Sequence, residues 1–405
     1  MKRTEGKQLK FASILNPFFM YALVWSIVLI VRSFNINHVY PATPMDLWIF
    51  IFLTIVIALF LGFVYNSLFL KKISSRTIEI TGKYPPYFLA VFCIIGFAAS
   101  VIYTGSIPII DTIRGTAESY REFGIPTVTP LVICATLALN AIASVKFFYG
   151  NQKRLANFII IAICWVIFLL IFSRGALIIC VATSLLIAFS RTRFSFKKGV
   201  AVILLALIFA FVFNIFGNIR QQSAWNDSSF IMGLSGFDTK YNWLSNFSWA
   251  IVYVDSPLGN LSYNVEYVSY LAEEHGLISQ LIPDLIAKRL WEVSSELYLP
   301  CPALNVASMY AGSYKFFGMF GMAIQFVEVS FISFIVAAIG TRRAETFLTL
   351  STYLSVLMAM TFFDNVFMYS GFSFAMLVII IFDLIRYPNP RRVIEPKTTL
   401  IEEKA

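Results

Sequence analysis

Arg174 is the one charged residue in a long apolar stretch that runs from Phe158 to Phe189. A helix needs about 20 apolar residues to cross the hydrocarbon core of a membrane, so the stretch is too long for one crossing and short for two. The tripeptide Ser-Arg-Gly at 173–175 can divide it, because glycine permits a tight turn and serine can cap the next helix. Arg174 would then lie at a helix N-terminus that already favours an anion, and its guanidinium can grip a phosphate bidentately. The spacing predicts a recessed anion site near the outer surface of a membrane.

Three more arginines are expected on the same side of the membrane. Arg220 follows another apolar run in GNIRQQ, and Arg114 and Arg121 lie in DTIRGTAESYREFG. If the four guanidiniums converge, they suit the diphosphate of a membrane-anchored substrate. In the alternative interpretation they snorkel to lipid phosphates or pair with nearby carboxylates, namely Asp111, Glu118 and Glu122. We favour the diphosphate role for Arg174, and both interpretations stay open for Arg121.

The elements that must position these arginines are transmembrane helices. Hydrophobic residues make up 59% of the chain and charged residues 13%, whereas globular chains hold about 25% charge. Apolar runs between charged breaks predict an all-α polytopic membrane protein with about ten transmembrane helices. The expected spans are 15–33, 47–69, 86–103, 128–148, 157–172, 175–190, 199–217, 316–340, 346–363 and 366–386.

The basic residues sort to one side of these spans. With both termini on that side, the tails and the alternate breaks contain 22 of the 31 Lys and Arg residues. Cytoplasmic segments carry such an excess, so both termini are expected in the cytoplasm. The net charge of +9 therefore reflects topology, and it does not call for a nucleic-acid partner.

Two long segments are expected on the outer side of the membrane. They divide the chain into helices 1–7 at 1–217 with a small loop at 104–127, a large loop at 218–315, and helices 8–10 with a tail at 316–405. The large loop is rich in aromatic residues among Asp, Glu and Asn, and we expect it to fold against the membrane. Aromatic rings beside carboxylates suit sugars, so Trp243, Trp249 and Tyr253 are candidate glycan-binding residues. The alternative places these rings at the membrane interface, where Trp and Tyr concentrate.

Four stretches in this order resemble bacterial O-antigen polymerases of the Wzy type. They are FSRGALI at 172–178, FGNIRQQ at 216–222, YVDSPLGNL at 253–261 and NVASMYAGSYKFFGMFG at 305–321, which ends in a Gly-x-x-Gly. With the helix layout, the resemblance covers about positions 90 to 340. It implies a GT-C-like glycosyltransferase of the bacterial inner membrane whose active site faces the periplasm.

The resemblance also implies the reaction and its participants. The enzyme would move a growing glycan from one undecaprenyl diphosphate to the non-reducing end of a repeat unit on another, with release of the diphosphate. Arginines would stabilise the charge that develops on this leaving group. The expected partners are lipid-linked oligosaccharides and membrane lipids, with a chain-length regulator and a flippase of the same pathway. The outer segments contain no Asp-x-Asp motif and no His or Cys cluster, so we expect no metal and no cofactor beyond the lipid carrier.

The acceptor hydroxyl in such a reaction needs a general base. The candidates are His275, Glu273 and Asp255, with Asp238 and Glu266 as competitors. Related ligases place a histidine before the Gly-x-x-Gly element, where this chain has Asn305 and Ser308, so that role is not transferred. His275 in LAEEHGL is alternatively the exposed end of a helix.

Two acids fall within expected spans. Glu328 is either functional or hydrogen-bonded to a neighbouring helix, because ionisable groups inside a membrane are costly. Asp383 precedes Arg386 by three residues, a spacing typical of a structural pair on one helix.

Three other functions stay open at this stage. A peptidoglycan polymerase of the shape and division class has the same helix layout and needs a catalytic acid in the large loop. A flippase for lipid-linked oligosaccharides would show pseudo-repeats and charges along a central path. A receptor or scaffold would not need arginines at an outer helix junction.

Overall fold

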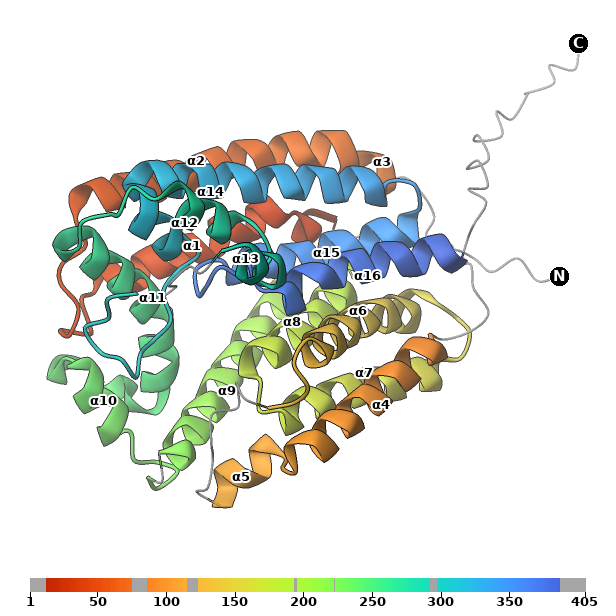
Figure 1. The fold of residues 1–405 in the computed structure, drawn as a ribbon, viewed down its shortest axis with the longest axis horizontal. Coiled ribbons are helices and arrows are strands. Elements are labelled where there is room, and N and C mark those ends of the chain that lie inside the picture. Colours follow the sequence, from red (N-terminus) through yellow and green to blue (C-terminus); the bar gives the residue numbers. More distant parts are fainter. Residues whose placement is uncertain are drawn as a thin grey trace, which may run out of the picture.

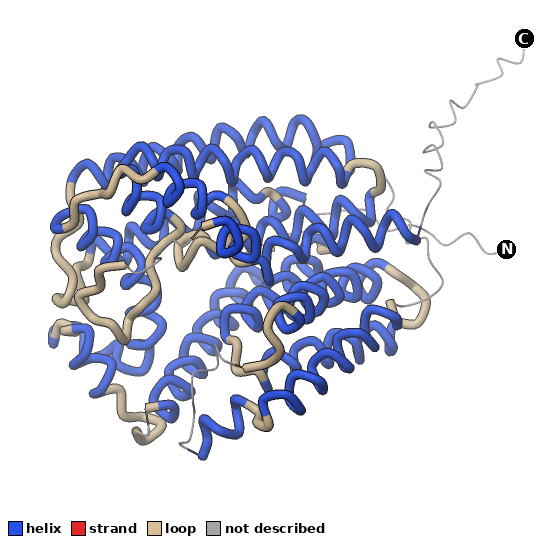
Figure 2. The backbone as a smooth tube through the Cα atoms, in the orientation of Figure 1, coloured by secondary structure: helices blue, strands red, loops and turns tan. Residues whose placement is uncertain are grey.

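The computed structural model describes residues 12–74, 86–114, 123–192, 195–221, 223–291 and 297–386. Over these ranges the fold is all-α (Figure 2), and the β-type pairing among them is a single isolated bridge between Asn37 and Phe237. This confirms the predicted all-α class.

Every expected span coincides with an apolar helix. These helices are α1 (Pro17–Ser33), α2 (Met45–Tyr65), α4 (Tyr87–Thr104), α6 (Val128–Tyr149), α7 (Arg154–Leu170), α8 (Arg174–Ser190), α9 (Phe196–Arg220), α14 (Tyr310–Gly340), α15 (Ala344–Met360) and α16 (Ser370–Arg386). Among the described residues, 5 helices are long and apolar enough to cross a membrane: Met45–Ile73, α4, α6, most of α9, and α14. The first of these is α2 continued through a π-helical turn, η2 (Asn66–Leu70), and α3 (Lys71–Ser74). The other apolar helices have 10–17 residues. Several candidate spans indicate a multi-pass membrane protein, and ten crossings stays a prediction.

The segments between these helices are themselves largely helical. The smaller one carries α5 (Pro108–Arg114), and the larger one carries α10 (Ser229–Ser235), the 3-10 helix η4 (Thr239–Phe247), α11 (Ser248–Tyr267), α12 (Glu274–Leu281) and α13 (Asp284–Leu290). A further 3-10 turn, η1 (Ala12–Leu15), precedes α1. In Figure 1, α10, α11 and α12 lie toward the left of the view, away from the C-terminal end of α16 on the right.

Two packing centres hold the bundle together. α6 packs against α4, α7, α8 and α16, while α1 packs against α2, α11 and α15 (Figure 1). The hydroxyl of Tyr21 on α1 hydrogen-bonds Thr54 at 2.9 Å and Tyr310 at 2.6 Å. Trp25 Nε1 donates to Thr361 Oγ1 at 3.1 Å. Hydrogen bonds between apolar helices therefore tie α1 to α2, α14 and the end of α15.

The start of α14 differs from the expected position. The span was predicted from 316, but the helix begins at Tyr310 and is broken by non-helical backbone at Phe317 and Gly318. Gly318 has φ +57°, and a Cβ there would lie 3.1 Å from the ring of Tyr270. The break therefore needs glycine for both conformation and space.

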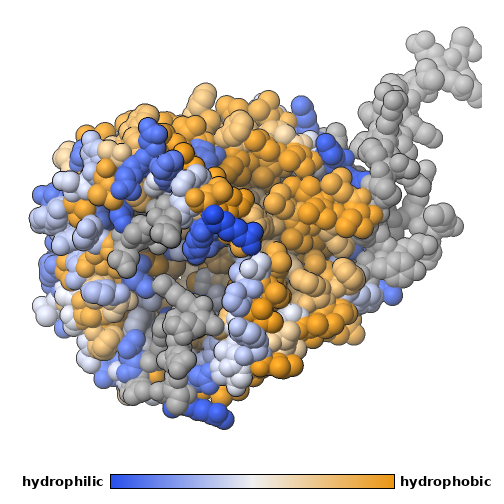
Figure 3. Space-filling model, in the orientation of Figure 1, coloured by the Kyte–Doolittle hydropathy of each residue, from blue (hydrophilic) through white to orange (hydrophobic). Residues whose placement is uncertain are grey.

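Large apolar side chains are exposed along several helices. Phe60 on α2 is 65% exposed, Phe88 on α4 is 87% exposed and Ile208 on α9 is 59% exposed. Figure 3 shows an apolar surface over the right side of the molecule and more hydrophilic residues at the left. An apolar surface of this extent is expected where helices meet lipid.

The two ends of the bundle should be labelled from opposite sides of the membrane. Asn226→Cys, in the exposed turn before α10, should react with an impermeant maleimide in intact spheroplasts. Arg342→Cys, in the exposed turn before α15, should react only after permeabilisation. The unaltered protein is a low-background control because its five cysteines are all buried. Labelling of Arg342→Cys in intact spheroplasts would reverse the topology.

Candidate functional site

Arg174 is the first residue of α8, where the sequence placed it. The turn before it differs from the prediction. The left-handed residue is Phe172, with φ +60°, and Gly175 is an ordinary helical residue. Ser173 makes no side-chain capping bond, although its carbonyl accepts the N–H of Leu177 at 3.0 Å. The predicted helix break is thus present, but it is made by Phe172.

The guanidinium of Arg174 lies among aromatic rings. Its central carbon is 5.4 Å from the ring centroid of Phe172 and 5.7 Å from that of Phe213 on α9. Both terminal nitrogens are buried. A side chain that snorkels to lipid phosphates would carry its nitrogens outward, so this position favours a role inside the protein.

The aromatic contacts continue from α9 to α11 and to the turn that follows α15. The rings of Phe213 and Tyr253 meet edge to face at 5.4 Å, and Tyr253 stacks on Phe363 at 5.9 Å. We call Arg174, Phe172, Phe213, Tyr253 and Phe363 the Arg174 cluster. The structure therefore brings two residues predicted independently, Arg174 and Tyr253, into one cluster.

The structure does not place the side chains of the other three candidate arginines next to Arg174. Arg220 ends α9, about 10 Å further along the helix than Phe213, and its side chain lies outside the described residues. Arg114 is exposed at the end of α5, and Arg121 lies outside the described residues. Convergence of all four guanidiniums stays a prediction.

The two candidate tryptophans occupy different environments. Trp243 in η4 is 75% exposed, as a glycan platform requires. Trp249 is 4% exposed, and its Nε1 donates to Asn218 Oδ1 at 2.7 Å. A Cβ at Gly217 would lie 2.5 Å from the Trp249 ring. These contacts favour packing between α9 and α11 as the role of Trp249.

Asp255 forms a buried ion pair with Arg32. Its two carboxylate oxygens each lie 3.3 Å from Nη1 of Arg32, and the two side chains are 1% and 2% exposed. Asn37 Nδ2 donates to the same carboxylate at 2.7 Å, and Arg32 also donates to Thr43 and to the Pro41 carbonyl. An enclosed, paired carboxylate is poorly placed to take a proton from a substrate hydroxyl, so this geometry argues against Asp255 as the base.

The Arg32–Asp255 pair also affects the hydroxyl pKa of Tyr40, whose ring centroid lies 5.7 Å from the Arg32 guanidinium. Burial raises the pKa of the Tyr40 hydroxyl well above its ordinary value, and the charge of Asp255 adds to the effect. Tyr40 is therefore a neutral, packed residue, and it contacts α11 where Gly259 leaves room for its ring.

Two of the remaining candidate bases, Glu273 and His275, lie at the start of α12. His275 is exposed in its first turn, and its ring stacks on Trp291 with centroids 5.8 Å apart. Glu273 is exposed and makes no capping bond to α12. A Cβ at Gly276 would lie 2.1 Å from the ring of Phe316, so α12 is held closely against α14. The competitor Asp238 accepts the backbone N–H of Lys240 and pairs with its side chain at 3.0 Å.

Asp284 fastens the large segment to the start of α16. Its carboxylate accepts the N–H and the hydroxyl of Ser370 at 2.9 and 2.7 Å, while the Ser370 hydroxyl oxygen accepts the N–H of Leu285. Partial burial raises the pKa of Asp284, but hydrogen bonds from Ser370 and Lys288 outweigh it and hold this pKa below its ordinary value. The contact is therefore stabilising at neutral pH and is lost as the pH falls through the lowered pKa.

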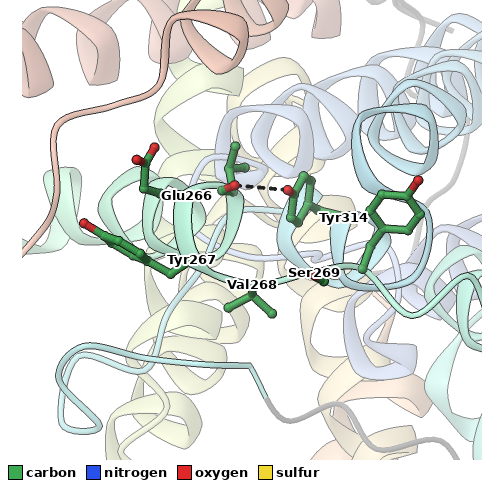
Figure 4. A pocket seen from close by; sticks show the side chains of 7 residues that line it. Glu266, Tyr267, Val268, Ser269 and Tyr314 are labelled. Atoms are coloured by element: carbon green, nitrogen blue, oxygen red, sulfur yellow. Dashed lines mark hydrogen bonds between the residues drawn. The ribbon is translucent and has the colours of Figure 1, made fainter.

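A surface pocket of about 590 Å³ lies where α11 ends beside α14 (Figure 4). It is lined by Val265, Glu266, Tyr267, Val268, Ser269, Tyr270 and Tyr314. Tyr314 Oη donates to the Val265 carbonyl at 3.3 Å, and the Leu271 N–H donates to the Lys315 carbonyl at 2.9 Å. Both bonds join the pocket walls to α14, just before its break at Gly318.

The acids inside the apolar helices have structural partners. Glu328 accepts a hydrogen bond from Gln325 on its own helix at 2.5 Å, and Gln325 in turn accepts from Ser313 and Asn365. Asp383 on α16 pairs at 3.3 Å with Arg343, which lies in the turn between α14 and α15. The side chain of Arg386, the partner that the spacing predicted, lies outside the described residues.

In the described part of the chain, no cluster of three or more His, Cys, Asp or Glu side chains is arranged to hold a metal ion. Comparison with family models, curated proteins and solved structures found no match in any of the three.

Removing the charge of Asp255 should destabilise the protein. Asp255→Asn leaves Arg32 buried without its counter-charge, and breaking a buried pair in this way costs about 3–5 kcal/mol. Thermal unfolding in detergent should show a clearly lower midpoint than for Asp238→Asn, a matched change at an exposed ion pair with Lys240. Equal midpoints for the two variants would show that the Arg32–Asp255 pair does not hold α11.

Proposed function

We propose that this protein is a membrane glycosyltransferase that polymerises oligosaccharide repeat units carried on undecaprenyl diphosphate. The single observation that carries the proposal is the position of Arg174. Arg174 is the first residue of an apolar helix, and its guanidinium lies near the rings of Phe172 and Phe213 with its terminal nitrogens buried. A charge in such a place is costly and is retained where it serves a function.

The proposed arrangement has about ten transmembrane helices in a GT-C-like fold, with both termini in the cytoplasm of a bacterial inner membrane. The charge pattern supports this orientation, because most lysines and arginines then lie on the cytoplasmic side. In this orientation the Arg174 cluster faces the periplasm. The lipid tail of the substrate lies in the bilayer, and its diphosphate lies at the depth of the α7–α8 turn. A chain-length regulator and a flippase of the same pathway are the expected partner proteins.

In the reaction, the bond between the anomeric carbon of the donor glycan and the diphosphate oxygen breaks. The electron pair leaves with the undecaprenyl diphosphate, and Arg174 stabilises the charge that develops there. The acceptor hydroxyl oxygen forms the new bond to the anomeric carbon, and its proton passes to a general base. His275 and Glu273 are exposed and stay candidates for that base, whereas Asp255 is enclosed by Arg32 and Asn37.

Arg174→Ala should abolish most polymer formation while the amount of protein in the membrane is unchanged. Loss of one charge-stabilising contact to a transition state costs about 2.7–4 kcal/mol, or roughly a hundred- to a thousandfold in rate. Arg174→Lys should recover only part of the activity, because an ammonium lacks the planar fork of a guanidinium. The measurement is polymer made per molecule of membrane protein in cells that lack the native copy.

Arg289→Ala is the matched control. Arg289 is an exposed arginine in the last turn of α13, and it is not part of the Arg174 cluster. It should leave polymer formation unchanged. Normal polymer per molecule in Arg174→Ala would contradict the proposal, and so would full activity in Arg174→Lys combined with poor insertion of the alanine variant.

A further inference from the structure

The pocket at the end of α11 has the chemistry of a site for a neutral sugar. Three tyrosine rings line it, and two of them, Tyr267 and Tyr270, are 63% and 56% exposed. The carboxylate of Glu266 can accept hydrogen bonds from sugar hydroxyls, while the hydroxyls of Ser269 and the tyrosines can donate or accept. Tyrosine combines an apolar face with such a polar group.

The charge of the lining selects among ligands. Among the described residues that line the pocket, Glu266 is the only acidic one, and none is lysine, arginine or histidine. A phosphate or an acidic sugar would meet only a negative charge there. One carboxylate also falls short of the several oxygen ligands that a hard cation takes. A neutral, hydroxylated ligand is what this lining fits.

The pocket is also far from the Arg174 cluster. Both contain residues of α11, and Tyr253 in the cluster precedes Glu266 in the pocket by 13 residues of one helix. That separation corresponds to about 20 Å along the helix axis. Glu266 is therefore too distant to take a proton from a hydroxyl that reacts at the diphosphate held by Arg174, which argues against it as the base.

We propose that this pocket, lined by Glu266, Tyr267, Tyr270 and Tyr314, is a saccharide subsite for the part of the glycan that lies away from the diphosphate. The inference rests on the proposed polymerase function. α11 connects the two sites, so an oligosaccharide whose reacting end lies at Arg174 can extend along this helix to the tyrosines. The subsite would retain the growing chain between successive transfers.

The side of the pocket that Tyr314 and Tyr270 form is held against α14 before any ligand binds. Tyr314 is 8% exposed and bonds to the end of α11, and Tyr270 packs over Gly318. A site whose side chains are fixed in this way loses little entropy on binding. Weak contacts to each sugar can therefore suffice to retain a chain.

The test uses the purified full-length protein and free oligosaccharides released by mild acid from the lipid-linked pool of the same cells. Tyr267→Ala and Glu266→Gln should weaken binding about tenfold or more, as truncation of a central aromatic or polar contact does. Saturation-transfer NMR measures this binding. In cells, both variants should shift the polymer toward shorter chains while the number of chains is retained. Tyr298→Ala and Asp227→Asn, at exposed residues outside the pocket, should match the unaltered protein in both readouts.

The outcomes separate this inference from the proposed function. If pocket variants bind sugar and make polymer as the unaltered protein does, while Arg174→Ala makes none, the subsite is refuted and the polymerase proposal stands. If the unaltered protein binds no oligosaccharide at all, the subsite is likewise refuted. If binding depends on Tyr267 and Glu266 but Arg174→Ala polymerises normally, the subsite is supported and the proposed role of Arg174 fails.

Discussion

The buried ion pair between Arg32 and Asp255 is the contact on which the position of α11 depends. It joins the last turn of α1 to the middle of α11, across 223 residues of sequence, and both side chains are almost fully enclosed. Breaking such a pair strongly destabilises the protein, because either partner alone would be a buried, uncompensated charge. Asn37, Thr43 and the Pro41 carbonyl satisfy the remaining hydrogen-bonding positions. The pair therefore fixes the middle of α11 against the end of α1.

α11 in turn positions most of the candidate site. Near its start Tyr253 joins the Arg174 cluster, and at its end Glu266 and Tyr267 line the pocket. Along its middle, Asn260 Nδ2 donates to the carbonyls of Leu304 and Val306, each at 2.7 Å. These bonds satisfy irregular backbone just before α14 that would otherwise be buried unpaired. One helix thus links the arginine that would face the diphosphate, the pocket that would hold sugar, and the entrance to α14.

Hydropathy was sufficient to locate the apolar helices, because the length of an apolar run is a local property of the sequence. Arg174 was recognisable for the same reason, since a lone charge in an apolar stretch is visible without tertiary information. The ion pair between Arg32 and Asp255 was not predictable, because nothing local in the sequence identifies either residue as the partner of the other. The same holds for Asp383 on α16, whose partner Arg343 lies in the turn before α15, 40 residues earlier in the sequence. The prediction that Gly175 makes the turn at 172–175 was also wrong. The left-handed residue of this turn is Phe172, and sequence patterns assign that conformation to glycine.

The account as a whole depends on polymerisation being an activity of this chain itself. The most direct measurement is reconstitution of the purified protein in liposomes with an undecaprenyl-diphosphate-linked oligosaccharide as the only glycan. We expect products that lengthen by whole repeat units, with one undecaprenyl diphosphate released for each bond formed. A substrate that remains unextended under these conditions, with correctly inserted protein, would contradict the assignment of this fold and its Arg174 cluster to glycan polymerisation.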